Sequence, residues 1–403
     1  MGDLKFEVVK KLAETSFKVK NFGSISKLDS NSPPSIFIGS KLQYPLVNVG
    51  ILSPVERDEN SWIYDDAKYW AKNNFGINNV LRLRGGLVNS RFQSQVYDSR
   101  VSGKKFVEIA KEIAVASKPV DVEIQLKHKL RLNSNLDRVL TPNGMKGQLE
   151  NAKITSNVSV DRQVDRVIND EIKSGEAIKL LYKKDFSEYT LSKILSVGVL
   201  GLKKNKRLVP TRWSITATDD TIGKQLLNNV RDYPILNDYE IFLGEFLGNQ
   251  YLIMLFPDVW SYELFELYYP GSSWNPGTEM KASTDNEWFE GRTSYVEQTA
   301  GGYYASRLPI IEYLNGIKRQ ASVLVVRLET PSYWAALGVW VVRESVRKAL
   351  ERGVMTFNSR EELIDSAKQI AKIKYDFDLN LILGKSKLLN QIKSQRKLGD
   401  FFT

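Results

Sequence analysis

The sequence predicts an α+β (mixed α/β) protein, with a larger strand-rich N-terminal domain that also has helices, a smaller helix-rich C-terminal domain, and a flexible C-terminal tail. Three observations lead to this prediction. The chain has 403 residues, which is too long for one ordinary hydrophobic core. The middle third contains several short apolar segments of the strand type. After residue 300, the apolar residues recur at helical spacing.

The first part of the chain mixes strands and helices. Turn-forming residues at 30–35 predict a loop, and the apolar runs that follow predict strands at 35–39 and 44–52. Residues 65–76 have the pattern of a helix that ends at Gly76. The other helices predicted here are a short amphipathic one at 5–16, a clearer one at 102–119 that ends at Pro119, and one at 161–172.

A strand with one buried face is predicted at 120–132, because apolar residues occupy nearly all its even positions and charged residues most odd ones. His128 is the only histidine of the chain and has the parity of the apolar positions. We therefore expect a hydrogen-bonded histidine in the core rather than a catalytic one.

Further along, residues 238–260 resemble two strands around the reverse-turn pair Gly248-Asn249, and 261–271 resemble a third strand. The Pro/Gly/Asn-rich stretch 270–293 is the expected domain junction. The C-terminal part is predicted to contain helices at 301–316 and 333–353 around a buried strand at 322–329, a capping box at 359–362, and a last short helix capped by Ser386.

Composition excludes much chemistry. The absence of cysteine excludes disulfides, thiol nucleophiles and cysteine-based zinc sites, so zinc is not expected. With one histidine, catalysis would have to rely on carboxylates and a metal ion. No apolar run is long enough to cross a bilayer, and the charged N-terminus lacks the apolar region of a secretory signal. We expect a cytoplasmic protein without a membrane partner.

Basic residues exceed acidic ones, and the net charge of +10 favours a polyanionic partner such as DNA. Local clusters lie at 203–207 and between Lys385 and Lys397. A solvated charged face is the alternative interpretation of each cluster.

The chain ends in QRKLGDFFT, in which four side chains form an ordered pattern. In one helical turn, Leu398, Phe401 and Phe402 converge into an apolar plug, and Gln395 offers an amide one turn earlier. Q-x-x-L-x-x-F-F resembles the PIP box, by which proteins bind the sliding clamp PCNA, at every defined position. The alternative is that both phenylalanines fold back onto their own domain. The resemblance implies PCNA as a partner.

Four longer stretches resemble the signature segments of the archaeal NreA-type DNA repair proteins: PPSIFIGSKLQYPLVNVGIL (33–52), LVPTRWSITATDDTIG (208–223), TAGGYYASRLPIIEYL (299–314) and LGVWVVRESVRKAL (337–350). The resemblance implies a DNA repair or DNA-damage-response factor, active at repair or replication sites on the archaeal nucleoid. Many relatives carry a cysteine-rich segment near the N-terminus, which this chain lacks. Either this member lost the metal site, or it belongs to a divergent branch such as the related NreB proteins. The expected parts are an N-terminal segment (1–32), an N-terminal domain (33–285), a C-terminal domain (286–384) and a basic tail with the PIP box (385–403).

An enzymatic role would need carboxylates that hold Mg²⁺ or Mn²⁺ near a phosphate. Asp219 and Asp220 are the best-placed pair, and the possible partners are Glu240, Glu245 and Glu329. Nearby, Arg212 and Trp213 could clamp a phosphate and stack a base. The structural alternative is an Arg–Asp pair beneath a buried tryptophan. In addition, two adjacent acidic residues on a strand would point to opposite faces and could not share one metal ion.

Two further segments could contact phosphates. Gly301 and Gly302 begin a predicted helix, with Arg307 one turn on, and helix N-termini favour anions. Arg82 and Arg84 precede a predicted flexible turn.

Two hypotheses remain. The first is a clamp-tethered repair factor that binds DNA and has no catalysis of its own. The second is a metal-dependent nuclease or other nucleic-acid-processing enzyme tethered to PCNA. A nucleotide transferase that uses residues 211–214 is a remoter third.

Overall fold

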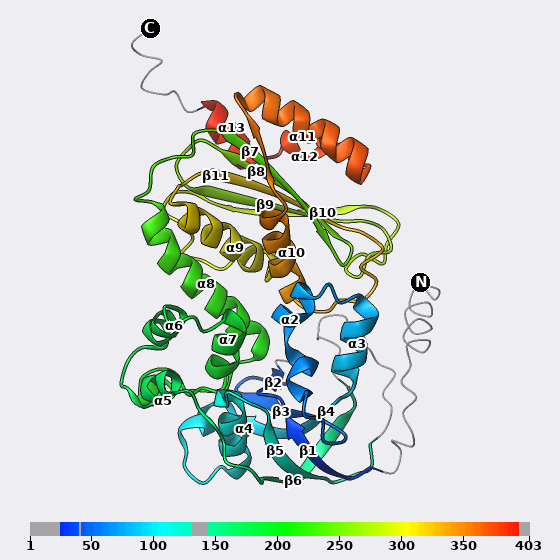
Figure 1. Ribbon diagram of the computed structural model, residues 1–403, viewed down its shortest axis with the longest axis vertical. Helices are drawn as coiled ribbons and strands as arrows, with labels where there is room; N and C mark the ends of the chain where they lie inside the picture. Colours follow the sequence, from blue (N-terminus) through cyan, green and yellow to red (C-terminus); the bar gives the residue numbers. More distant parts are fainter. Residues whose placement is uncertain (1–24, 40–41, 131–143, 395–403) are drawn as a thin grey trace. The chain divides into compact units, whose positions relative to one another are not determined.

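The computed structural model describes residues 25–39, 42–130 and 144–394 (Figure 1). The chain divides into two compact units. Unit 1 consists of Met1–Ile222 with Ala335–Gly338, and unit 2 of Gly223–Trp334 with Val339–Thr403. Within the described residues, no helix is both long and apolar enough to cross a membrane.

Unit 1 contains a six-stranded mixed sheet with the strand order β1-β5-β6-β4-β3-β2. Only the pairing of β4 with β6 is parallel. The predicted strands at 35–39 and 44–52 are confirmed as β2 and β3. The strands are β1 (Lys27–Ser32), β2 (Ile36–Gly39), β3 (Leu46–Pro54), β4 (Leu87–Gln95), β5 (Val120–Leu126) and β6 (Lys146–Ile154).

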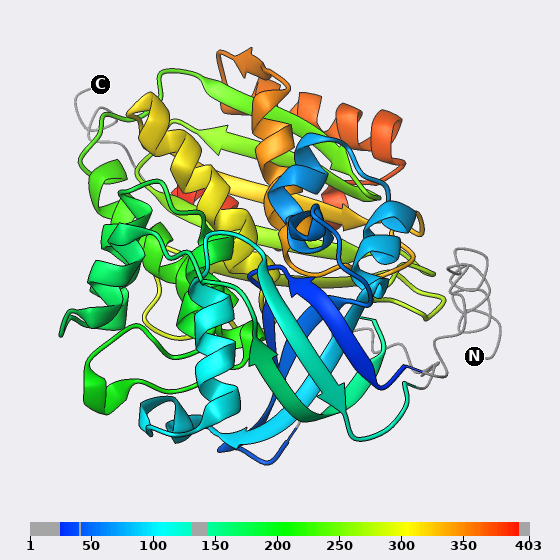
Figure 2. The same ribbon diagram turned by 60° about the horizontal axis from the view of Figure 1, so that its bottom comes forward.

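Helices pack around this sheet, and α4 lies against β2, β3 and β6 (Figure 2). Its buried face includes Ile109, Ala110 and Ile113, as the helical spacing predicts. The helical elements are η2 (Ser61–Asp65), α2 (Ala67–Lys72), α3 (Ile77–Gly85), η3 (Val96–Arg100), α4 (Lys105–Val115), α5 (Arg162–Asn169), α6 (Ser174–Tyr182), α7 (Glu188–Ser196), η4 (Lys203–Asn205) and α8 (Thr211–Val230).

Among the elements predicted for unit 1, the loop expected at 30–35 begins only after β1 ends at Ser32. Two further predictions for this unit are wrong. Gly76 does not end a helix: α2 ends at Lys72, and Gly76 precedes α3, where its N–H donates to the side chain of Asn79 over 3.1 Å. His128 is exposed rather than buried. The pairing of β5 with β6 shifts register between Gln125 and Leu126, so the alternation of the sequence no longer reports which face is buried beyond that point.

Unit 2 contains a second six-stranded mixed sheet, with the strand order β10-β9-β11-β8-β7-β12. The adjacent strands β9 and β11 are parallel, and the other pairs are antiparallel. The predicted strand at 322–329 and the strands at 238–260 and 261–271 are confirmed. The strands are β7 (Tyr239–Phe246), β8 (Asn249–Phe256), β9 (Ser261–Tyr268), β10 (Lys281–Glu287), β11 (Ser322–Glu329) and β12 (Val354–Phe357).

The turn of the β7–β8 hairpin is Leu247-Gly248, one residue earlier than predicted. Both residues have positive φ, 52° and 75°, and Phe246 pairs with Asn249. A Cβ at Gly248 would lie 2.4 Å from the backbone nitrogen of Tyr333, so the turn needs glycine at this position.

Helices cover both faces of the second sheet (Figure 1). On one face, α9 (Gly302–Ile317) and α10 (Trp340–Glu351) pack on apolar residues such as Ile253, Leu264 and Val325. The opposite face packs against α11 (Arg360–Tyr375), α12 (Asn380–Leu383) and α13 (Lys387–Ser394). The apolar strands β8 and β11 are buried on both faces for this reason.

The predicted caps are confirmed. Ser359 accepts a hydrogen bond from the N–H of Glu362 at the start of α11, and Ser386 accepts one from the N–H of Leu389 at the start of α13. The helix expected at 333–353 begins only at Trp340, because Gly338 has a φ of 108°. The stretch 270–293, expected as a domain junction, contains β10, and the two compact units divide within α8. The fold class predicted from the sequence is confirmed.

Candidate functional site

Charged residues gather on one face of the second sheet, at the carboxyl ends of the parallel strands β9 and β11. Arg327 lies opposite Glu266 in the register of β11 and β9, and Glu329 lies opposite Asn249 of β8. Residues two apart in a strand share a face, so Arg327 and Glu329 point the same way. We call Asn249, Glu266, Arg327 and Glu329 the Arg327 cluster. Carboxyl ends of adjacent parallel strands are a common place for functional sites.

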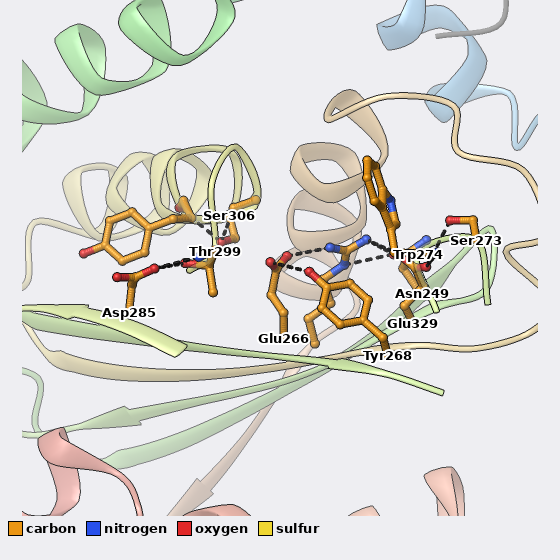
Figure 3. Close-up of polar contacts among 12 residues, drawn as sticks. Asn249, Glu266, Tyr268, Ser273, Trp274, Asp285, Thr299, Ser306 and Glu329 are labelled. Atoms are coloured by element: carbon orange, nitrogen blue, oxygen red, sulfur yellow. Dashed lines mark hydrogen bonds and ion pairs between the residues drawn. The ribbon is translucent and has the colours of Figure 1, made fainter. Parts of the chain in front are cut away.

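The guanidinium of Arg327 is the centre of the cluster, because it binds all three other members. Figure 3 labels these partners, Asn249, Glu266 and Glu329. The guanidinium donates to Oε1 of Glu266 over 2.5 Å and to Oε2 of Glu329 over 2.9 Å. It also donates twice to the side-chain oxygen of Asn249, over 3.0 and 2.6 Å. All four side chains are buried, and charge-assisted hydrogen bonds of this kind are among the strongest that proteins form.

The remaining carboxylate oxygens also accept hydrogen bonds. The hydroxyl of Tyr268 donates to Oε2 of Glu266 over 2.8 Å. The hydroxyl of Ser273 and the backbone N–H of Trp274 each donate to Oε1 of Glu329 over 3.0 Å. Each carboxylate oxygen of the cluster is therefore bound by a protein donor, which makes the cluster a rigid structural unit.

Burial is the largest influence on the pKa values of Glu329 and Tyr268. It raises the pKa of Glu329, although the charge of Arg327 and the donors Ser273 and Trp274 act in the opposite direction. Burial and the neighbouring Glu266 raise the pKa of the Tyr268 hydroxyl, which therefore stays a hydrogen-bond donor. Two carboxylates share one guanidinium, so the cluster does not attract a further anion.

Gly301 and Gly302, predicted to cradle a phosphate, lie at the N-terminus of α9. Gly301 has a φ of 85°. A Cβ at Gly302 would lie 2.2 Å from Oε1 of Glu266, so this carboxylate lies directly against the helix N-terminus. Negative charge is favourable at that end of a helix, and here a side chain of the protein supplies it.

Arg307, the third residue of that prediction, is 1% exposed. Its Nε donates to Glu287 over 2.8 Å, and the indole of Trp260 donates to the same carboxylate oxygen over 2.9 Å. Arg307 thus stabilises the core between β10 and α9. The structure brings Arg307 and the two glycines onto one helix, but the arginine faces Glu287.

Arg82 and Arg84 lie on α3 rather than before a flexible turn, and they differ in environment. Arg82 is exposed. Arg84 donates to Asp65 over 2.8 Å, and its guanidinium lies 5.1 Å from the centre of the Trp70 ring. The nearby Lys193 and Arg84 lower the pKa of Asp65 against the opposing effect of burial.

Asp219 and Asp220 lie on helix α8, not on a strand; Asp219 is buried and Asp220 half-buried. Of their possible partners, Glu329 belongs to the Arg327 cluster, and Glu240 and Glu245 lie on β7. Within residues 25–39, 42–130 and 144–394, no three acidic or histidine side chains come together in a way that could hold a metal ion.

Arg212 and Trp213, at the start of α8, are both exposed. The tryptophan is not buried above an Arg–Asp pair, which corrects the structural alternative considered for this segment. Its ring lies 5.9 Å from the ring of Tyr44, a residue that sequence reasoning missed. The four motif residues Gln395, Leu398, Phe401 and Phe402 lie outside the described residues.

Sequence reasoning also missed the Arg327 cluster as a unit. A signal was present: β9 and β11 are apolar strands in which Glu263, Glu266, Arg327 and Glu329 interrupt the hydrophobic run. Charged residues in a strand buried on both faces need a counter-ion or hydrogen-bond donors. The strand order that makes Arg327 and Glu266 neighbours could not be read from the chain.

The fold defines a protein of two mixed sheets, each covered by helices, with a buried ion cluster at the parallel strands of the second. The chain belongs to the archaeal Nre family. The model of the archaeal Nre N-terminal region matches residues 1–275, and the model of the Nre C-terminal region matches residues 287–401.

Three relatives show this similarity over most of their length. The DNA repair protein NreA of Haloferax volcanii is 41% identical over 323 residues, which are 79% of this chain and 77% of the relative. NreA of Archaeoglobus fulgidus is 37% identical over 347 residues, 85% and 86% of the two chains. The DNA repair protein NreB of Archaeoglobus fulgidus is 32% identical over 372 residues, 92% and 91% of the two chains. The chain is therefore of the NreA type, and no solved structure matches it.

Proposed function

We propose that this protein is a DNA repair factor that is recruited to the sliding clamp PCNA through residues 395–402 and that binds DNA through basic surfaces. The names of the relatives support a role in DNA repair. The net charge of +10 supports a polyanionic partner. We place its action in the cytoplasm, on the nucleoid, where clamp and chromosome meet.

The observation that carries the proposal is the complete motif Q-x-x-L-x-x-F-F directly after an anchored helix. Leu388 and Leu389 of α13 are buried in the apolar core of unit 2. The carboxylate of Glu263 accepts hydrogen bonds from the N–H groups of Lys387 and Leu388 over 3.0 and 3.1 Å. Helix α13, Lys387–Ser394, is thus fixed within unit 2, and in the sequence the motif begins at Gln395.

Three apolar side chains can supply the affinity. Burying Leu398, Phe401 and Phe402 in a pocket of the clamp contributes roughly 5–8 kcal/mol before the cost of ordering the chain. The amide of Gln395 would fix the register of the motif. Short helical-turn motifs of this kind bind through a few anchors.

The test is calorimetric titration of the archaeal PCNA with the full chain and with the double variant Phe401→Ala/Phe402→Ala. We expect binding to be lost while the thermal unfolding midpoint stays unchanged. Ile373→Ala removes an apolar side chain that is 82% exposed on α11, and it serves as the matched control with full clamp binding.

Full-strength binding by the double variant, or by a chain without residues 395–403, would refute recruitment through this motif. A lower unfolding midpoint in the double variant would show that the two phenylalanines belong to the core of the protein instead.

A further inference from the structure

We propose that unit 1 carries a binding surface for single-stranded DNA, formed by the exposed rings of Tyr44, Tyr97 and Trp213 together with the surrounding basic residues. This inference rests on the proposed DNA-binding function and deepens it, because it names the surface and the form of the DNA. We call these three rings and the basic residues Arg100, Lys203, Lys204, Arg207 and Arg212 the aromatic–basic surface.

The first part of the surface is a pair of exposed rings. Trp213 is 49% exposed and Tyr44 is 45% exposed, and their ring centres lie 5.9 Å apart with an angle of 44° between the planes. Large aromatic side chains are normally buried, and two of them in contact on a surface indicate a binding site. An unpaired base can stack on such rings.

The second part is Tyr97, which is 44% exposed. The guanidinium of Arg100 lies 4.9 Å from the centre of its ring, and the same guanidinium donates to the backbone oxygen of Lys204. A cation over an aromatic ring is held in place without losing its charge, so it remains able to contact a phosphate.

Backbone hydrogen bonds join these parts into one surface. The N–H of Val96 donates to the oxygen of Pro45 over 3.0 Å, which places Tyr97 and Tyr44 in adjacent segments. The N–H of Leu208 donates to the oxygen of Val96 over 2.8 Å. Thr211 accepts a hydrogen bond from the N–H of Ile38 over 2.8 Å and so holds the start of α8, with Arg212 and Trp213, on the sheet.

The charge of the surface favours a polyanion. The segments 97–100 and 203–213 contain six basic residues against the single carboxylate of Asp98, and that carboxylate pairs with Lys104 over 3.5 Å. Glu171 also faces this region, where it accepts a hydrogen bond from the backbone N–H of Lys203. Arg100, Lys203, Lys204, Arg207 and Arg212 are exposed. Phosphates can therefore pair with exposed cations around the aromatic rings.

Exposed rings together with exposed cations favour single-stranded over double-stranded DNA. In a duplex, the faces of the bases are already stacked on one another, so protein rings cannot reach them without unpairing. Aromatic rings beside a basic groove are the common solution for single-stranded DNA. A surface that bound duplex phosphates alone would not need three exposed rings.

The experiment measures the fluorescence anisotropy of a labelled 20-nucleotide oligo(dT) and of a labelled 20-base-pair duplex, each titrated with the full chain. We expect the single strand to bind more tightly. Tyr44→Ala/Trp213→Ala should weaken single-strand binding by about tenfold or more, since each stacked base contributes roughly 5- to 150-fold. Trp213→Phe should retain most of the affinity because it keeps a ring.

The salt dependence of DNA binding distinguishes the contribution of the cations from that of the rings. Arg100→Gln/Arg207→Gln/Arg212→Gln should reduce the slope of log affinity against log salt by about 2, whereas the aromatic variant should keep the slope of the original protein. Trp288→Ala, which removes a 38% exposed ring from unit 2, is the control and should bind like the original. Equal unfolding midpoints establish that the variants are folded.

The proposal is overturned if the aromatic variant binds oligo(dT) as tightly as the original, or if duplex binds more tightly and neither variant changes its affinity. Tighter binding of a matched RNA strand would reassign the surface to RNA. Failure here is distinguishable from failure of clamp recruitment, because the Phe401→Ala/Phe402→Ala variant should keep its DNA affinity.

Discussion

Glu263 of β9 and Ser386, 123 residues later, are joined by a buried hydrogen bond from the serine hydroxyl to the glutamate. The same carboxylate accepts from two backbone N–H groups in the first turn of α13. Burial raises the pKa of Glu263, although these donors act against the rise. Strand β9, which lies next to the edge strand β10, thus holds the helix that precedes the terminal motif in the sequence.

Ser386→Ala removes the cap of α13 and should destabilise this helix by about 1 kcal/mol. Hydrogen exchange at Leu388 and Leu389 should then become roughly fivefold faster. Ser394→Ala, at the other end of the helix, is the control, because its hydroxyl is exposed and bonds only the nearby oxygen of Gln391 among the described residues. Unchanged exchange in Ser386→Ala would mean that the leucines and the backbone contacts with Glu263 hold the helix without the serine hydroxyl.

Gly302→Ala and Gly316→Ala place the same methyl group at two positions of α9 with opposite consequences. At Gly302, the new Cβ would lie 2.2 Å from the Glu266 carboxylate, so Glu266 must shift within the Arg327 cluster. We expect a loss of about 1–3 kcal/mol in the free energy of unfolding. At Gly316, the new Cβ would meet no described atom within 4 Å beyond the neighbouring residues and the backbone of its own helix, and alanine should stabilise the helix by about 0.5–1 kcal/mol. Urea unfolding measures both, and equal effects would contradict this account of Gly302.

Arg327→Met should be strongly destabilising, by about 3–5 kcal/mol, because Glu266 and Glu329 would remain buried without their counter-ion. Arg360→Met removes a half-buried arginine whose partner Glu361 is exposed, and it should change the stability by less than about 0.5 kcal/mol. Circular dichroism during urea unfolding compares them. A mild effect of Arg327→Met would show that the two carboxylates take up protons instead, and stability would then rise at lower pH.

Glu240 makes a prediction about pH. Burial, followed by the charge of Asp238, raises its pKa in the folded protein, while a hydrogen bond with Tyr313 acts in the opposite direction. The folded state therefore binds the proton more tightly than the unfolded state does, and this contribution to stability is lost as pH rises from about 4.3 through the raised value.

Glu240→Gln removes that dependence. The stability of the variant relative to the original protein should rise as pH increases from 4 to 8, as measured by urea unfolding at each pH. Glu351→Gln, at an exposed position at the end of α10, is the matched control variant. A constant difference between Glu240→Gln and the original protein would refute the account.

Much of the fold could be predicted because its causes are local. Residues 322–329 form an apolar run between helical patterns, and the strand occupies this range. The caps at Ser359 and Ser386 also depend on a few neighbouring residues. Prediction failed where a residue far away in the sequence determined the local structure. A bulge against β6 ended the alternation before His128, and Tyr333 required the glycine of the β7–β8 turn at the second position.

The candidate site residues also fall into those that the sequence could identify and those whose partners depend on the fold. Composition excluded cysteine chemistry, and short-range spacing identified the terminal motif and the exposed pair Arg212 and Trp213. The sequence could not show that Arg307 faces Glu287 or that Arg84 faces Asp65, since burial and ion pairing depend on strand order and helix packing.

Local periodicity and residue type were thus enough to predict the α+β class and to recognise the terminal motif, because each depends on residues within a few turns of one another. The family was predicted differently, from the resemblance of four long stretches to its signature segments. Only the folded chain revealed the Arg327 cluster and the aromatic–basic surface. Their members come from segments far apart in the chain, and the pairing of strands brings such segments together through the burial of apolar surface across long separations.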